Sequence, residues 1–133
     1  MSDTKIELEL PYPPSVNTYY RHVGARTLIS AKGRQYRWSV CELLMVARAR
    51  PVMAAQAEPM TGPLHIAIEI YPPDKRRRDI DNVLKALLDA LEHAGAYEDD
   101  SQIVRLEIIK CDPIKGGKTI VRIEGARIRE ISK

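Results

Sequence analysis

In two segments of the chain, large apolar residues alternate with polar or small ones, and each segment stops at a proline. In the first, Ile6, Leu8 and Leu10 are separated by charged residues; in the second, the apolar residues stand at positions 64, 66, 68 and 70. A period of two is typical of a strand with one face in the core and one in solvent. The pattern therefore predicts strands over 5–10 and 64–71, in a sheet that needs cover on one face.

Helical spacing supplies that cover. Ser30 is a suitable N-cap for a helix over residues 31–50, where apolar residues recur every three or four positions. A second helix is predicted over 80–93, with Gly95 as its C-terminal signal. The aromatic and polar stretch 17–22, which follows a proline-rich turn, is expected to be a loop.

Two more strands are predicted over 102–110 and 118–124, paired as a hairpin. The stretch 51–63 has mixed signals and is interpreted as a connector, and the end from 126 is expected to fray. The order of elements favours an α+β fold: one small domain over residues 1–133, with a mixed β-sheet of about four strands and two main helices packed on it.

Composition excludes several classes of protein. Cys41 and Cys111 stand too far apart for a zinc motif and are too few for a disulfide framework, which fits a reducing compartment. No stretch approaches the ~18 consecutive apolar residues of a membrane span, so a soluble, cytoplasmic protein is expected. The net charge of +3 is mild, but basic residues concentrate in 21–37 and 75–78, where they could form a footprint for nucleic acid.

The strongest chemical signal is a cationic run that leads directly into acidic residues. The run 75–78 is followed by Asp79 and Asp81, and after a helix-length interval by Asp99 and Asp100. Because gathered carboxylates repel each other, such a site usually needs a divalent cation, most readily Mg²⁺. Arginines beside that cation would hold a phosphodiester.

Spacing places three of these groups at one helix end. Asp79 precedes the helix, Asp81 lies in its first turn, and Lys85 projects from the same face four residues later. Lys85 could then orient a metal-bound water or stabilise a leaving oxygen. The second acidic pair must return along a helix of ~21 Å to join them, so Asp100 or Asp99 must lie on a segment running back beside the helix start.

Each part also has a simpler interpretation. The acids at 79 and 81 could merely cap the helix, the arginines could be solvated, and Lys85 could pair with a nearby aspartate. Tyr19 and Tyr20, beside Arg21, could stack on unpaired bases or could pack in the core. A phosphodiester-cutting enzyme, a DNA-binding accessory protein without catalytic activity, and a phosphotransfer enzyme for small nucleotides therefore all remain open.

Three separated motifs, in order, resemble the RusA family of Holliday junction resolvases, small endonucleases typical of phages and prophages. They are PYPPSVNTYYR at 11–21, RRRDIDNVLK at 76–85 and GAYEDD at 95–100. The resemblance implies a homodimer that binds four-way DNA junctions and resolves them by paired, symmetric, Mg²⁺-dependent nicks in DNA recombination and repair. A two-fold dimer also suits a junction that needs two cuts.

The resemblance also assigns residues. It implies metal ligation by Asp79, Asp81 and Asp100, with Asp99 secondary, and a supporting catalytic Lys85. Mn²⁺ is expected to substitute for Mg²⁺, with no organic cofactor and no membrane partner, in the cytoplasm of a bacterial or phage-infected cell. The expected DNA-binding residues are Arg76, Arg77, Arg78, Tyr19, Tyr20 and Arg21.

Overall fold

The structure is a computed structural model, which describes residues 5–50 and 58–126. Four strands form one sheet in the order β1-β6-β4-β5, and two more form a separate hairpin. The strands are β1 Lys5–Leu10, β2 Tyr20–Val23, β3 Arg26–Ile29, β4 Leu64–Tyr71, β5 Ile103–Lys110 and β6 Lys118–Gly125. The helices are α1 Val16–Tyr19, α2 Ala31–Arg48 and α3 Leu84–His93, with a 3-10 turn at Asp100–Gln102.

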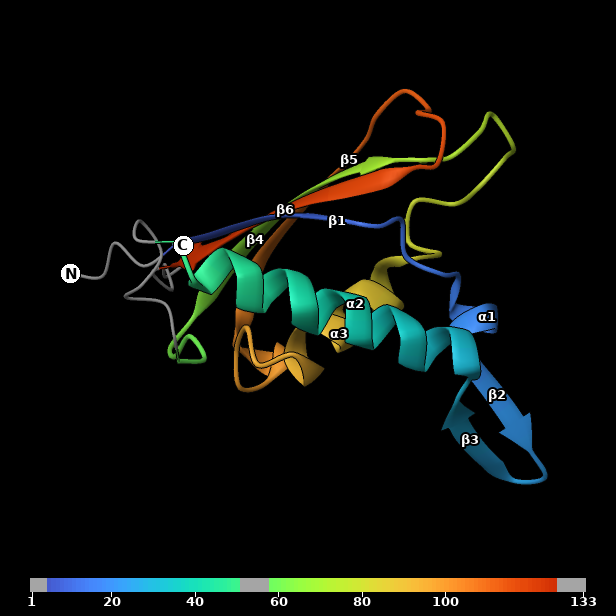
Figure 1. The fold of residues 1–133 in the computed structure, drawn as a ribbon, viewed down its shortest axis with the longest axis horizontal. Helices are drawn as coiled ribbons and strands as arrows, with labels where there is room; N and C mark the ends of the chain where they lie inside the picture. The colour runs from blue at the N-terminus through green and yellow to red at the C-terminus, as the bar shows by residue number, and fades with distance from the viewer. Residues whose placement is uncertain (1–4, 51–57, 127–133) are drawn as a thin grey trace, which may run out of the picture.

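The long helices α2 and α3 lie against one face of the sheet, as Figure 1 shows. The alternating apolar residues of β1 and β4 point into this layer, and Tyr36, Val40 and Leu44 of α2 and Leu87 and Leu91 of α3 meet them there. The opposite face carries charge: Arg122 bridges Glu7 and Glu69 at 3.2 and 3.1 Å. The predicted α+β fold, with four strands and two main helices, is confirmed.

One pairing prediction was wrong. Strands β5 and β6 do not form a hairpin, because each pairs with a different edge of β4. β5 runs parallel to β4 after the α3 crossover, and β6 runs antiparallel between β4 and β1. A helix between two consecutive strands favours their parallel pairing, so β5 occupies one edge of β4. β6 then pairs with the other edge of β4 and not with β5. The connection 111–117 then crosses the end of β4.

Two local predictions were also wrong. The segment 17–22 is not a loop: residues 17–19 belong to α1, and residues 20–22 belong to β2 of the β2–β3 hairpin. Helix α3 begins at Leu84, four residues after its predicted start, and residues 80–83 form a turn that leaves Ile80 exposed. Apolar spacing could not separate this turn from the helix, because a turn places its residues at similar intervals.

The remaining predictions fall partly outside the described residues. The connector 51–63 is described only from Glu58, and the final segment only at Ala126. Within the described parts of the chain, no helix combines the length and apolar character that crossing a membrane requires.

Candidate metal and nucleic-acid site

The first acidic pair, Asp79 and Asp81, is exposed on the loop 72–83 between β4 and α3, which we term the acidic loop. The backbone N–H of Asn82 donates to the carbonyl of Asp79 at 3.1 Å, and that of Leu84 donates to the carbonyl of Asp81 at 3.2 Å, so both residues shape the turn with their backbones. Val83 is the N-cap of α3, and none of the described side chains caps this helix. Both carboxylates are therefore exposed and unused by the fold, and the capping interpretation is wrong for this helix.

The loop is held from two sides. The N–H of Val16 donates to the carbonyl of Asn82 at 2.9 Å, which fixes the proline-rich segment beside the acids. The guanidinium of Arg78 pairs with Asp74 at 2.8 Å and lies over the ring of Tyr12. Hydrogen bonds that the Asp74 carboxylate accepts from the Arg78 guanidinium and from the backbone N–H of Arg76 lower the pKa of this carboxyl. Arg78 therefore has a structural role in the loop.

The neighbouring cations are free to meet a ligand. The side chains of Arg76 and Arg77 are exposed on the loop, and Lys85 is exposed on α3 one turn after Asp81. The expected proximity of Lys85 to Asp81 agrees with this placement. The loop thus carries two exposed guanidinium groups, and the helix that follows it carries an exposed ammonium; such groups suit phosphate oxygens.

The second acidic pair lies at the other end of α3. One carboxylate oxygen from each of Glu92, Asp99 and Asp100 lies within 4.8 Å of the others, and Glu92 accepts from the Asp100 N–H at 3.0 Å. Hydrogen bonds from the Ser101 side chain and N–H lower the pKa of the Asp99 carboxyl. Sequence reasoning missed Glu92, although its position seven residues after Lys85 places it on the same helix face.

One chain alone does not bring the two acidic pairs together. The ten residues of α3 span about 15 Å. Asp79 and Asp81 precede its first turn, whereas Asp99 and Asp100 follow its last. After α3 the chain does not run back to the start of this helix: Asp99 and Asp100 lie beside Glu92, near the end of α3.

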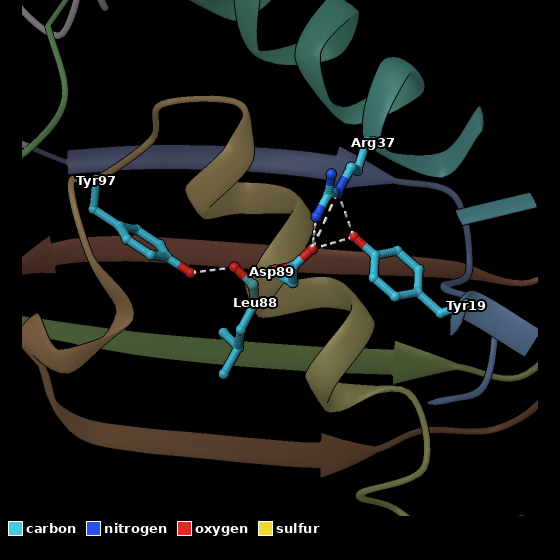
Figure 2. A network of polar contacts seen from close by, with 5 residues as sticks. All are labelled: Tyr19, Arg37, Leu88, Asp89 and Tyr97. Carbon is cyan, nitrogen blue, oxygen red and sulfur yellow. Dashed lines mark hydrogen bonds and ion pairs between the residues drawn. The ribbon is translucent and has the colours of Figure 1, made fainter. Parts of the chain in front are cut away.

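Beside this helix, three side chains form a partly buried network, shown in Figure 2. The Tyr19 hydroxyl donates to Asp89, and Arg37 donates to Asp89 at 2.8 Å and to the Tyr19 oxygen at 2.9 Å. Tyr97 donates to the carbonyl of Leu88 at 2.7 Å on the other side of the helix. The network joins α1 and α2 to the middle of α3.

This network uses one of the predicted DNA-binding tyrosines. Tyr19 is fully buried, and burial followed by the hydrogen bond to Asp89 raises the pKa of its hydroxyl. Its ring is thus not placed to stack on a base. Tyr20, which packs edge-on against it at 4.9 Å between ring centroids, keeps part of its ring exposed.

Asp89→Asn is expected to lower the free energy of unfolding by about 1–3 kcal/mol, because it leaves Arg37 without its charged acceptor. Burial raises the pKa of the Asp89 carboxyl, but hydrogen bonds from Tyr19 and Arg37 outweigh it, so the folded pKa lies below the usual value. The stabilisation is therefore present above about pH 4 and is lost as pH falls through the folded pKa.

Urea unfolding at pH 7 and pH 3 measures both effects. The exposed Asp112→Asn is the matched control, with a change below about 0.5 kcal/mol. An Asp89→Asn effect as small as that of the control at pH 7 would show that the network does not stabilise the fold.

The fold and the site together define a small α+β domain that offers carboxylates and guanidinium groups on one exposed loop, an arrangement suited to phosphodiesters. The sequence profile described as endodeoxyribonuclease RusA matches residues 11–124. The crossover junction endodeoxyribonuclease RusA of Escherichia coli strain K12 is 42% identical over 111 residues, which cover 84% of this chain and 87% of that protein.

Two phage proteins of the same description are similarly close. The crossover junction endodeoxyribonuclease of Enterobacteria phage 82 is 42% identical over 84% of this chain and 87% of its own, and that of phage HK97 is 40% identical over 86% and 89%. The chain belongs to the RusA endodeoxyribonuclease family, whose members cut phosphodiester bonds within DNA.

Proposed function

We propose that this protein is a Mg²⁺-dependent endonuclease that resolves four-way DNA junctions by paired, symmetric nicks. The names of its relatives supply the substrate and the reaction. The observation that carries the proposal here is that Asp79 and Asp81 are exposed while α3 has no side-chain cap. An accessory protein without catalytic activity, the alternative, would need those acids for the fold.

The donor set fits a hard divalent cation. Every candidate ligand is a carboxylate, and Mg²⁺ prefers oxygen ligands and usually takes only one or two carboxylates while keeping several waters. Asp79, Asp81 and Asp100 would hold it, with Asp99 secondary, and Mn²⁺ would substitute. The bound ion would supply an activated water and would offset charge at the phosphoryl oxygens.

The remaining residues position the DNA. Arg76 and Arg77 lie on the acidic loop, where they would bind the phosphates beside the one that is cut, and Arg78 holds that loop through Asp74. The ammonium of Lys85 would donate to the leaving oxygen. Since bacterial and phage proteins are among the relatives, we place this DNA in the cytoplasm of a bacterial or phage-infected cell.

A homodimer would bring the separated acids together. Asp81 lies in the turn just before α3, and the helix itself carries the exposed Lys85 in its first turn, the half-buried Leu88 in the middle and Glu92 near its other end. If a two-fold axis perpendicular to α3 passed near Leu88, two α3 helices would run antiparallel. Asp79 and Asp81 of one protomer would then lie near Asp100 of the partner, and each dimer would hold two identical composite sites.

An apolar surface beside α3 suits this contact. Leu106 on the edge strand β5 is paired with Ile66 of β4, whose side chain enters the core, so Leu106 lies on the helix-covered side of the sheet. It nevertheless remains 38% exposed, and Val104, two residues earlier, remains 47% exposed. Together with the partly buried Leu84 and Leu88, these two residues make up what we term the α3–β5 face. Exposed apolar residues that cluster on one surface often mark an interface.

Leu106→Glu is expected to convert the dimer to monomers, because it would place a charge within the apolar contact. Cleavage should fall at least about 100-fold, which corresponds to about 2.7 kcal/mol. Light scattering after size exclusion measures the mass, and circular dichroism checks that the fold persists. The matched control is Met45→Glu, which changes an apolar residue that is 71% exposed on α2. A monomer from the control and a dimer from Leu106→Glu would move the interface to α2.

Cleavage of a labelled synthetic four-way junction tests the function itself. The junction and a linear duplex of the same sequence are each incubated with the protein in Mg²⁺ and in Ca²⁺. We expect two nicks at symmetric positions on the junction in Mg²⁺ alone. Binding without cleavage in either Mg²⁺ or Mn²⁺ would support the accessory-protein alternative, and equal cleavage of the duplex would show a nuclease without junction selectivity.

A further inference from the structure

The β2–β3 hairpin forms a ribbon that stands apart from the rest of the fold. It belongs to its own two-stranded sheet and projects from the end of the molecule where α2 begins (Figure 1). Every side chain from Arg21 to Leu28 is exposed, so the ribbon contributes almost nothing to the core. Since an isolated two-stranded ribbon is only marginally stable, this one depends on how its base is attached.

The ribbon and the helix start behind it have charge of one sign only. No aspartate or glutamate occurs between Glu9 and Glu42, whereas this segment contains five lysine or arginine residues. Arg21 and Arg26 lie on the two strands, and Lys32 and Arg34 follow in the first turn of α2; all four are exposed. The fifth, Arg37, is held in the network with Asp89. A surface of this kind attracts a polyanion.

The base of the ribbon is fixed by close backbone contacts. The N–H of Ser30 donates to the Tyr19 carbonyl at 2.9 Å, and the Ser30 hydroxyl donates to the Thr18 carbonyl at 2.6 Å. Gly33 lets α2 approach so closely that a Cβ there would lie 2.5 Å from the backbone carbonyl oxygen of Tyr19. The guanidinium of Arg34 donates to the carbonyl of Ile29 at 2.9 Å. These contacts fix the positions at which β2 and β3 leave the rest of the fold.

The same base is tied to the helix that carries the acids. Tyr19 ends α1 and immediately precedes the ribbon, and its hydroxyl donates to Asp89 of α3, as Figure 2 shows. At the other end of α1, the Val16 N–H donates to the carbonyl of Asn82 in the acidic loop. The ribbon therefore has a set position relative to Asp81 and Lys85.

We propose that residues 20–29, with Lys32 and Arg34 behind them, form a fixed arm that binds the phosphates of duplex DNA flanking the cleavage point. This rests on the proposed function, because it takes the DNA to be already placed on the acidic loop. A fixed arm loses little conformational entropy on binding. Its contacts are to the backbone, so its contribution is independent of base sequence and falls as salt rises.

The test compares junction binding by Arg21→Ala/Arg26→Ala and by Arg50→Ala. Arg50 is also exposed but lies beyond the far end of α2, about 27 Å along that helix from the arm. Each change is made in the Asp81→Asn background and measured in Ca²⁺ over a range of salt, so that the readout does not depend on cleavage. Thermal unfolding confirms that both variants fold.

The arm variant is expected to bind at least about tenfold more weakly, and the slope of log affinity against log salt should fall by about 1.8 for two lost phosphate contacts. The control should keep both values. If Arg21→Ala/Arg26→Ala had the same affinity and the same salt slope as Arg50→Ala, the proposal that the arm binds DNA would be wrong. Since binding alone is measured, a weakened arm variant supports the arm even if the wild type never cuts a junction, and an unchanged one refutes it even if the wild type does.

Discussion

Asp81→Asn is expected to reduce junction cleavage by at least about 10³-fold, or about 4 kcal/mol of transition-state stabilisation. The change removes one negative oxygen from the set that would hold Mg²⁺ and leaves the shape of the side chain almost unchanged. Asp81 is exposed and only its backbone carbonyl is used by the fold, so stability should hold. Junction binding should be equal or tighter, because a negative charge near phosphate is lost.

Single-turnover cleavage and an equilibrium binding assay separate these effects. Asp112→Asn removes an equally exposed carboxylate from the 111–117 connection and is the matched control, with wild-type values for both measurements expected. If Asp81→Asn still cleaved within about threefold of this control, or less than about 0.7 kcal/mol, the carboxylate would have no catalytic role. The protein would then be better described as a DNA-binding accessory.

Mixed dimers of Asp81→Asn and Asp100→Asn subunits are expected to regain cleavage that neither variant has alone. The two acids lie at opposite ends of α3. The proposed composite site would therefore take Asp81 from one protomer and Asp100 from the partner. In a mixed dimer, one composite site carries both changes and the other carries none. One of the two sites in each mixed dimer is therefore intact, and each mixed dimer should nick one strand of the junction.

Co-expression with two affinity tags isolates the mixed dimer, and the two pure variants are the controls. A mixed dimer as inactive as its parents would contradict the composite arrangement. In that case both acids would have to serve the same protomer, which would require a rearrangement at the end of α3.

The local part of the fold could be predicted from the sequence. Alternation of large apolar residues over 5–10 and 64–71 determines β1 and β4, and a Ser30-capped apolar pattern determines α2, because each of these elements depends on neighbouring residues. The pairing of β5 and β6 depends instead on which edge of β4 is free after the α3 crossover. The turn residues between β5 and β6 carry no information about that edge. The polar 17–22 segment likewise gave no sign of a ribbon that has no buried face.

The site divides in the same way. The exposure of Asp79, Asp81 and Lys85 at one helix end follows from their spacing, and the structure agrees. The position of Asp100 depends on the path of the chain after Gly95. That path brings Asp100 beside Glu92 at the end of α3, and not back to the helix start. The proposed composite site would be shared between two protomers, and such a site leaves no pattern in the residue spacing of one chain. What suggested it is the separation of the two acidic pairs at opposite ends of α3.

Cleavage of a supercoiled plasmid that extrudes a cruciform tests the central claim most directly. The first nick releases the supercoiling and allows the cruciform to be reabsorbed, so two cuts are seen only when both strands are nicked within one protein–junction complex. We predict that linear plasmid forms in Mg²⁺ without accumulation of nicked circles, and that a plasmid lacking the cruciform stays intact. Nicked circles as the main product, or equal cutting of the plasmid without a cruciform, would contradict a dimer with two complete sites that resolves junctions.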